Sequence, residues 1–365
     1  MAVCTPDLYQ AVSRSFVNSY TMKRRNFFIK TGLAAVAAGL QLPEGMAQTP
    51  IYRHKPNRIR AGATISLIAP GSPITAVRYT QLLDNMRTLG FQVKEGQYTH
   101  AIRGYLAGTD AERLADLHAA FADPEVEAVW CIRGGYGASR LLPKIDYDLI
   151  RRNPKPFIGY SDITALHLAI HEKTGLVCFH GPVAASEFPE DTVQYFRSVL
   201  MEPTAPFTIA IPVADAVLPG EEFRPFVINP GQAQGTLTGG NLSLLAALAG
   251  TPYLPSFKHK IVFLEDIGEQ PYRIDRMLYQ LAQATDLTQA AGVALGVFTD
   301  CNPKGEAPSL TLVETLTDFF AQWKMPVLYG LPFGHIAHQA TLPYGIQAEM
   351  DTAKGTLTLL ERAVE

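Results

Sequence analysis

From about Ala61 onward, the chain alternates short, continuously apolar runs with segments in which apolar residues recur at the helical period. Apolar runs stand at residues 64–69, 126–132 and 157–159, and amphipathic segments at 76–89 and 110–122. Strands that are apolar along their whole length are typical of parallel sheets covered by helices on both faces. The pattern predicts a doubly wound, flavodoxin-like α/β domain over residues 61–183, with functional loops after the strands.

The α/β pattern weakens between residues 184 and 234, where prolines interrupt short apolar pieces. We interpret this segment as a linker or crossover. The pattern resumes at Gly235, with strands expected at 260–264 and 292–298. A smaller C-terminal α/β domain is therefore expected over residues 235–365. The length of 365 residues agrees with two cores, because single cores stop growing at roughly 250–300 residues.

A basic cluster that includes Arg24 and Arg25 precedes two phenylalanines and an alanine-rich apolar run. The cluster resembles a twin-arginine export signal, and the small residues Gly45 and Ala47 are typical of a peptidase cleavage site. We expect residues 1–47 to direct export to the periplasm, and the mature chain to leave the membrane. The alternative is an uncleaved amphipathic helix, because the run is too short to span a bilayer.

Charge and cysteine content argue against a nucleic-acid-binding protein, a disulfide-rich protein and a cysteine-ligated metal site. The chain carries 31 basic and 34 acidic residues, a net charge of −3, which exerts no general attraction on nucleic acid. No nucleic-acid partner is therefore expected. Beyond the leader, Cys131, Cys178 and Cys301 are widely spaced. Their spacing fits neither a disulfide framework nor a metal site.

Ser161 lies between the apolar run at 157–159 and a helix-period segment. A strand-to-helix turn presents its side chain at the sheet edge, where backbone N–H groups can stabilise an oxyanion. Ser161 is therefore a candidate nucleophile, although Ile163 stands where the α/β-hydrolase elbow has glycine. The alternative is that Ser161 or Asp162 caps the following helix.

Gly134, Gly135 and Gly137 follow the apolar run at 126–132. Glycines allow a close approach of backbone to another group. The turn could cradle a phosphate, although it matches no phosphate-binding motif. It could instead donate a backbone N–H to an oxyanion beside Ser161, or serve only as a tight turn.

Two carboxylates, Glu265 and Asp266, end the strand expected at 260–264, and His335 and His338 lie in a loop rich in glycine and proline. Two histidines at this spacing could bind zinc, but no third ligand is nearby in sequence. A serine nucleophile requires an imidazole base, which in turn requires an orienting carboxylate. Ser161, His335 and Glu265 would supply these roles, whereas Asp266 could equally be a solvated loop charge.

Four motifs, taken together and in order, resemble the L,D-carboxypeptidase family of serine peptidases, which includes the microcin C immunity peptidases. They lie at residues 133–137, 159–162, 264–276 and 334–345. The resemblance implies that Ser161 is the nucleophile, His335 the general base and Glu265 its orienting carboxylate. It also implies an oxyanion hole formed by the backbone N–H groups of Asp162 and Gly135.

The same resemblance implies a homodimer that needs no metal or organic cofactor and removes the terminal D-alanine from the murein tetrapeptide. One alternative is a peptidase acting on another peptide conjugate, as in the immunity branch. Another is a non-catalytic muropeptide-binding protein. His180, which follows an apolar run, could line the pocket or be a buried structural histidine.

Overall fold

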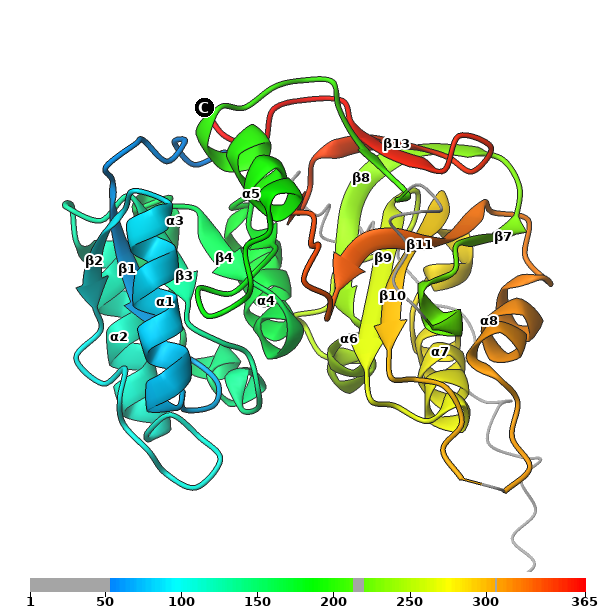
Figure 1. The fold of residues 1–365 in the computed structure, drawn as a ribbon, viewed down its shortest axis with the longest axis horizontal. Coiled ribbons are helices and arrows are strands. Elements are labelled where there is room, and N and C mark those ends of the chain that lie inside the picture. Colours follow the sequence, from blue (N-terminus) through cyan, green and yellow to red (C-terminus); the bar gives the residue numbers. More distant parts are fainter. Residues whose placement is uncertain (1–52, 213–219, 306) are drawn as a thin grey trace, which may run out of the picture. The chain divides into compact units, whose positions relative to one another are not determined.

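The computed structural model describes residues 53–212, 220–305 and 307–365, so the expected export signal at 1–47 lies outside the described residues. Within these ranges, no helix has the length and apolar character needed to cross a membrane. The described chain is built around two sheets, one of six strands and one of eight (Figure 1).

The first sheet has the strand order β12-β5-β4-β3-β1-β2. Its strands are β1 (Thr64–Ile68), β2 (Gln92–Glu95), β3 (Ala128–Cys131), β4 (Phe157–Gly159), β5 (Phe179–His180) and β12 (Leu342–Pro343). The first five are parallel, in the order 2-1-3-4-5 of flavodoxin-like sheets. The predicted doubly wound fold is confirmed. The added strand β12 is antiparallel and comes from the far end of the chain.

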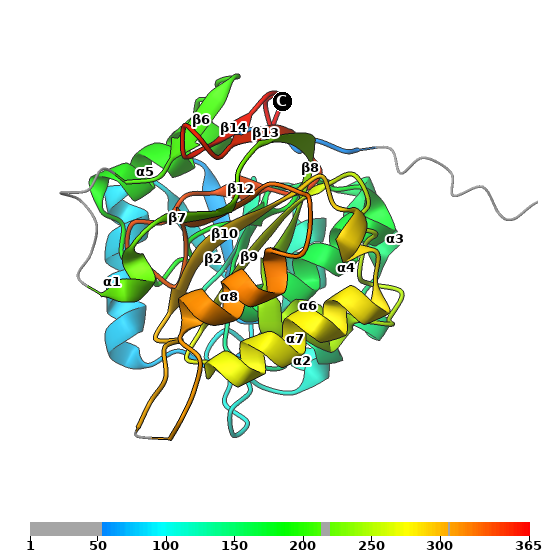
Figure 2. The same ribbon diagram turned by 90° about the vertical axis from the view of Figure 1, so that its right-hand side faces the viewer.

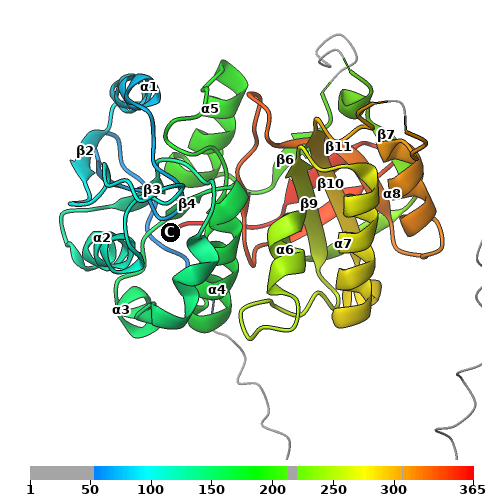
Figure 3. The same cartoon turned by 90° about the horizontal axis from the view of Figure 1, so that it is seen from below.

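Helices cover both faces of this sheet. They are α1 (Ala76–Thr88), α2 (Asp110–Ala122), α3 (Tyr147–Arg152), α4 (Thr164–Thr174) and α5 (Glu190–Phe196). Figure 3 shows α1 and α5 on one face and α2, α3 and α4 on the other. Local sequence explains where the helices begin: Thr75 caps α1, and Thr109 and Glu112 form a capping box at α2.

The second sheet has the order β6-β14-β13-β8-β9-β10-β11-β7. Its strands are β6 (Phe207–Ala210), β7 (Phe226–Asn229), β8 (Gln232–Asn241), β9 (Ile261–Ile267), β10 (Gly292–Thr299), β11 (Val327–Gly334), β13 (Gln347–Asp351) and β14 (Thr356–Leu359). Strands β8 to β11 are parallel. Helices α6 (Leu242–Leu248), α7 (Pro271–Ala284) and α8 (Leu312–Phe320) pack side by side (Figure 2).

The segment 184–234, expected to be a linker or crossover, contributes strands to the second sheet. It contains α5, and its strands β6 and β7 form the two edges of the second sheet. Pro206 and Pro225 directly precede these strands. Proline is tolerated at sheet edges because an edge strand has one unpaired side. Short, proline-bounded edge strands therefore resemble a linker in sequence. Because β6 and β7 belong to the second sheet, this sheet has more strands than the first, although the C-terminal domain was expected to be the smaller one.

Close backbone contacts join α4 to the end of β8. The backbone N–H of Asn241 donates to Thr164 Oγ1 over 3.1 Å. A Cβ at Gly240 would lie 2.6 Å from the same oxygen, so the approach requires glycine. Helix α4 also packs against α6. These contacts bring the helix that follows Ser161 next to the strands that carry Glu265 and His335.

Candidate active site

Ser161 adopts a backbone conformation that residues other than glycine rarely adopt. It lies between β4 and α4, in the 3-10 turn Ser161–Ile163, with φ of 63°. This left-handed region is costly for residues other than glycine. A Cβ at Gly159 would lie 3.0 Å from the Ile163 side chain, so the turn is closely packed. A strained strand-to-helix turn of this kind is the geometry that presents a nucleophile.

The glycine-rich turn after β3 packs its backbone against Ser161. A Cβ at Gly134 would lie 2.9 Å from the Cβ of Ser161 and 3.2 Å from the backbone nitrogen of Asp162. Gly135 has φ of 104°, and a Cβ there would overlap Ser72. Side chains are thus excluded from this turn, and the backbone of Gly134 and Gly135 lies beside the candidate nucleophile.

The carboxylate of Asp162 is buried and links the two turns. Its Oδ2 accepts a hydrogen bond from the backbone N–H of Ala138 over 2.9 Å. Burial raises the pKa of Asp162. The N-cap alternative is wrong for both residues, since Ile163 occupies the N-cap of α4 and no side chain caps it. Asp162 instead holds the glycine-rich turn against the turn that carries Ser161.

Glu265 and His335 form a hydrogen-bonded pair at the ends of β9 and β11. His335 Nδ1 lies 2.8 Å from Glu265 Oε2, and the Glu265 side chain is fully buried. Burial disfavours the charged form of each, but their mutual attraction outweighs it. The net effect lowers the pKa of Glu265 and raises that of His335. The pair therefore favours an ionised carboxylate that orients the imidazole.

Tyr160 connects this pair to the Ser161 turn. Its ring centroid lies 4.8 Å from that of His335. Within the described residues, no hydrogen bond joins Ser161 Oγ to His335, and catalytic hydrogen bonds are often loose without substrate. Tyr160 was not assigned a role from the sequence. Its place directly before Ser161 was the only available signal.

Asp266 is buried, so its interpretation as a solvated loop charge is wrong. It accepts hydrogen bonds from the Asn241 side chain at 3.0 Å and from Ser243 N and Oγ at 2.9 and 2.8 Å. Burial and the neighbouring Glu265 charge raise its pKa to about 6. Asp266 thus holds the start of α6 against β9, whereas Glu265 points to the histidine.

His338 and His180 do not belong to the Glu265–His335 pair. His338 Nδ1 lies 2.9 Å from Asp191, whereas His335 pairs with Glu265. In the ranges that the structure describes, no three His, Cys, Asp or Glu side chains gather as a metal site would need. His180 is fully buried, with its ring centroid 5.3 Å from that of Phe263. Burial lowers the pKa of His180 to about 4, and it lies in the core rather than lining a pocket.

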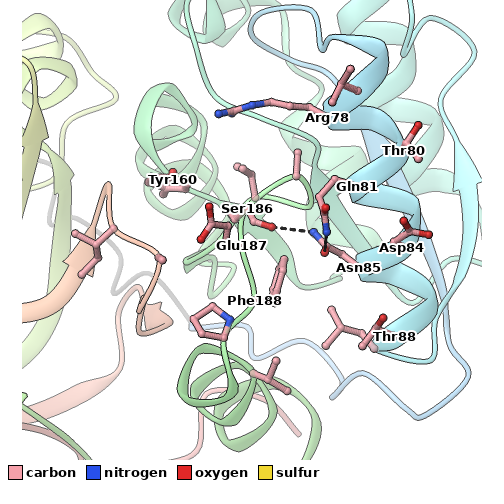
Figure 4. A pocket seen from close by; sticks show the side chains of 18 of the residues that line it. Arg78, Thr80, Gln81, Asp84, Asn85, Thr88, Tyr160, Ser186, Glu187 and Phe188 are labelled. Atoms are coloured by element: carbon pink, nitrogen blue, oxygen red, sulfur yellow. Dashed lines mark hydrogen bonds between the residues drawn. The ribbon is translucent and has the colours of Figure 1, made fainter. Parts of the chain in front are cut away.

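A cavity of about 1210 Å³ opens beside the candidate base. Tyr160 and His335 contribute to its wall, together with α1 and residues 183–189 after β5. Figure 4 shows these lining side chains, with Arg78 extending from α1 toward the side of the view where Tyr160 lies. The cavity is large enough for a short peptide and gives it access to His335.

The chain is similar to peptidases along most of its described length. Family models match twice, the LD-carboxypeptidase N-terminal domain at residues 65–181 and the LD-carboxypeptidase C-terminal domain at 234–350. A probable murein peptide carboxypeptidase from Bacillus subtilis is 41% identical over 312 residues, which cover 84% of this chain and 94% of that protein.

Two further comparisons agree. A murein tetrapeptide carboxypeptidase from Pseudomonas aeruginosa is 36% identical over 293 residues, which cover 79% of this chain and 92% of that protein. The crystal structure of a muramoyltetrapeptide carboxypeptidase from Oxalobacter formigenes matches with a TM-score of 0.71 at 29% identity. The match covers 82% of this chain and 99% of that one.

Proposed function

This chain belongs to the LD-carboxypeptidase family of peptidases, and from that premise we propose that it is a serine L,D-carboxypeptidase. Its substrate is the murein tetrapeptide, from which it removes the terminal D-alanine. One observation carries the proposal: the buried Glu265–His335 pair lies beside the strained turn of Ser161. These are the three groups that acyl transfer by a serine requires.

The mechanism follows from this arrangement. With its Nδ1–H donated to Glu265, His335 keeps Nε2 free to take the Ser161 proton. Ser161 Oγ then bonds to the carbonyl carbon before the terminal D-alanine, and the backbone N–H groups of Asp162 and Gly135 bind the oxyanion. His335 passes the proton to the leaving amine as the C–N bond breaks. Water, deprotonated by His335, then hydrolyses the acyl-enzyme and frees Ser161.

The proposal also covers location and assembly. The basic leader before residue 47 supports export to the periplasm through a twin-arginine route. Cell fractionation tests this, because the protein staying in the cytoplasm would contradict it. The resemblance to the family supports a homodimer, which sedimentation of the purified protein tests by its mass.

The test of the activity is D-alanine release from murein tetrapeptide by the purified protein, beside Ser161→Ala and with a chelator. We expect release that the chelator leaves unchanged and that Ser161→Ala abolishes. Release by Ser161→Ala would contradict the role of Ser161. No release by either protein would favour another peptide conjugate or a binding role.

A further inference from the structure

Apart from His335, one basic side chain lines the cavity beside the candidate base. Arg78 is the only arginine or lysine among the lining residues. It is exposed, and it forms no ion pair with any other residue that the structure describes. Two carboxylates, those of Asp84 and Glu187, also line the cavity. Asp84 is paired with Arg87, its Oδ1 2.6 Å from Nη1, and within the described residues neither carboxylate forms an ion pair with Arg78. Arg78 is therefore available to bind an anion.

The backbone that carries Arg78 is firmly placed. Arg133, from the glycine-rich turn, donates from Nη1 to the carbonyl of Pro73 over 2.9 Å, just before α1. Farther along α1, the Asn85 amide donates to the carbonyls of Ala184 and Ser186 at 2.9 and 2.8 Å. These bonds hold α1 against the opposite cavity wall. The position of Arg78 relative to the site is thus set by the fold.

The guanidinium of Arg78 extends across the cavity toward the part of the wall formed by Tyr160 (Figure 4). Burial raises the pKa of Tyr160 to about 12, and the charge of Arg78 partly opposes this rise. The guanidinium is therefore within electrostatic reach of the ring that contacts His335. Tyr160 directly precedes Ser161, so the wall that Arg78 faces adjoins the turn of the candidate nucleophile.

We propose that Arg78 binds the terminal carboxylate of the residue that the enzyme releases. This inference rests on the proposed function and adds the group that restricts cleavage to the end of a peptide. A carboxypeptidase must recognise a free carboxylate, and the planar guanidinium of arginine matches a carboxylate with two parallel hydrogen bonds. Arg78 is then a specificity-determining residue that makes no contact with the bond that breaks.

The experiment compares two substrates, the murein tetrapeptide and the same peptide ending in D-alaninamide, which lacks the negative charge. The full-length protein is assayed beside Arg78→Met and Arg78→Lys. Arg152→Met is the control, since Arg152 is exposed on α3, lies outside the cavity lining and forms no ion pair with any residue that the structure describes. Far-ultraviolet circular dichroism and melting temperature confirm that each variant is folded.

We expect the unmodified protein to cleave the amide about tenfold or more slowly in kcat/KM than the acid, as loss of one charged hydrogen bond predicts. Arg78→Met should lose a similar factor on the acid, mainly through a higher KM, and nothing more on the amide. Arg78→Lys should lose less than Arg78→Met on the acid, and Arg152→Met should match the unmodified protein on both substrates.

Equal cleavage of acid and amide by the unmodified protein would overturn the role of Arg78 and leave the proposed peptidase activity intact. An Arg78→Met loss of equal size on both substrates would also overturn it, because that loss would not depend on the carboxylate. Absence of cleavage of either substrate by the unmodified protein would overturn the proposed function, and this inference with it.

Discussion

At the residue scale, substitutions of Ser161 distinguish the backbone strain of its turn from its chemical role. A side chain at φ of 63° costs on the order of 1 kcal/mol or more, which glycine avoids. Ser161→Gly and Ser161→Ala should both abolish D-alanine release. Urea denaturation should find Ser161→Gly more stable than Ser161→Ala by about 1 kcal/mol. Equal stability of the two variants would show that the turn relaxes without the serine.

The Glu265–His335 pair predicts a shift in the pH profile. His335 must be neutral to accept a proton, and Glu265 raises its pKa above the usual value of 6.5 against the opposing effect of burial. Activity should therefore fall as the pH drops through a value above 6.5. Glu265→Gln removes the main charge that raises the pKa of His335 and leaves burial opposed only by the charge of Asp266. The acid limb of kcat/KM should therefore move to lower pH while kcat falls.

Asp191→Asn is the matched control for that measurement, because Asp191 pairs with His338 in the same way but at the surface. Its profile should keep the acid limb of the unmodified protein. An acid limb that stays in place in Glu265→Gln would contradict the assignment of His335 as the titrating base. The same shift in Asp191→Asn would show that a general change in surface charge is responsible.

At the element scale, a buried side-chain amide of α1 binds the segment after β5. Asn85 donates to the carbonyls of Ala184 and Ser186. Asn85→Ala should lower the free energy of unfolding by about 1–3 kcal/mol, because buried carbonyls lose their donor. It should also raise KM, since the cavity walls are no longer held together. Urea denaturation and steady-state kinetics measure both effects.

Thr80→Ala provides the control on the same helix. Thr80 is exposed and bonds only to the carbonyl of Ala76 within α1. Such a surface change should alter stability by no more than about 0.5 kcal/mol. If Asn85→Ala were equally mild, the clamp between α1 and residues 184–186 would contribute little to the shape of the cavity.

At the scale of the whole molecule, the two sheets share segments of chain. Strand β12 belongs to the first sheet, yet it lies between β11 and β13 of the second in sequence. The Tyr344 hydroxyl, just after β12, donates to the Gly239 carbonyl of β8 over 3.1 Å. The buried apolar side chains of both sheets also form one continuous cluster, so the two sheets should unfold together. Calorimetry should give a single transition with equal calorimetric and van't Hoff enthalpies, and two separate transitions would contradict this.

The sequence by itself determined the local features. Apolar runs and helix-period segments predicted the order of strands and helices in the first sheet, and residues next to each other in the chain marked the Ser161 turn and the glycine-rich turn. These features depend on the backbone and on neighbours within a few residues. The succession of strands and helices along the chain, the nucleophile candidate and the glycine-rich turn were for that reason accessible without a structure.

Only the tertiary structure decided which distant residues meet. The family resemblance predicted that Glu265 orients His335, but the two are 70 positions apart and pair because β9 and β11 end at the same edge of one sheet. Tertiary packing also turned the proline-bounded segment into edge strands of the second sheet. It placed Asp266 in the interior and Arg78 on the wall of the cavity. No local pattern encodes such contacts, because burial and sheet pairing arise only when segments far apart in the chain pack together.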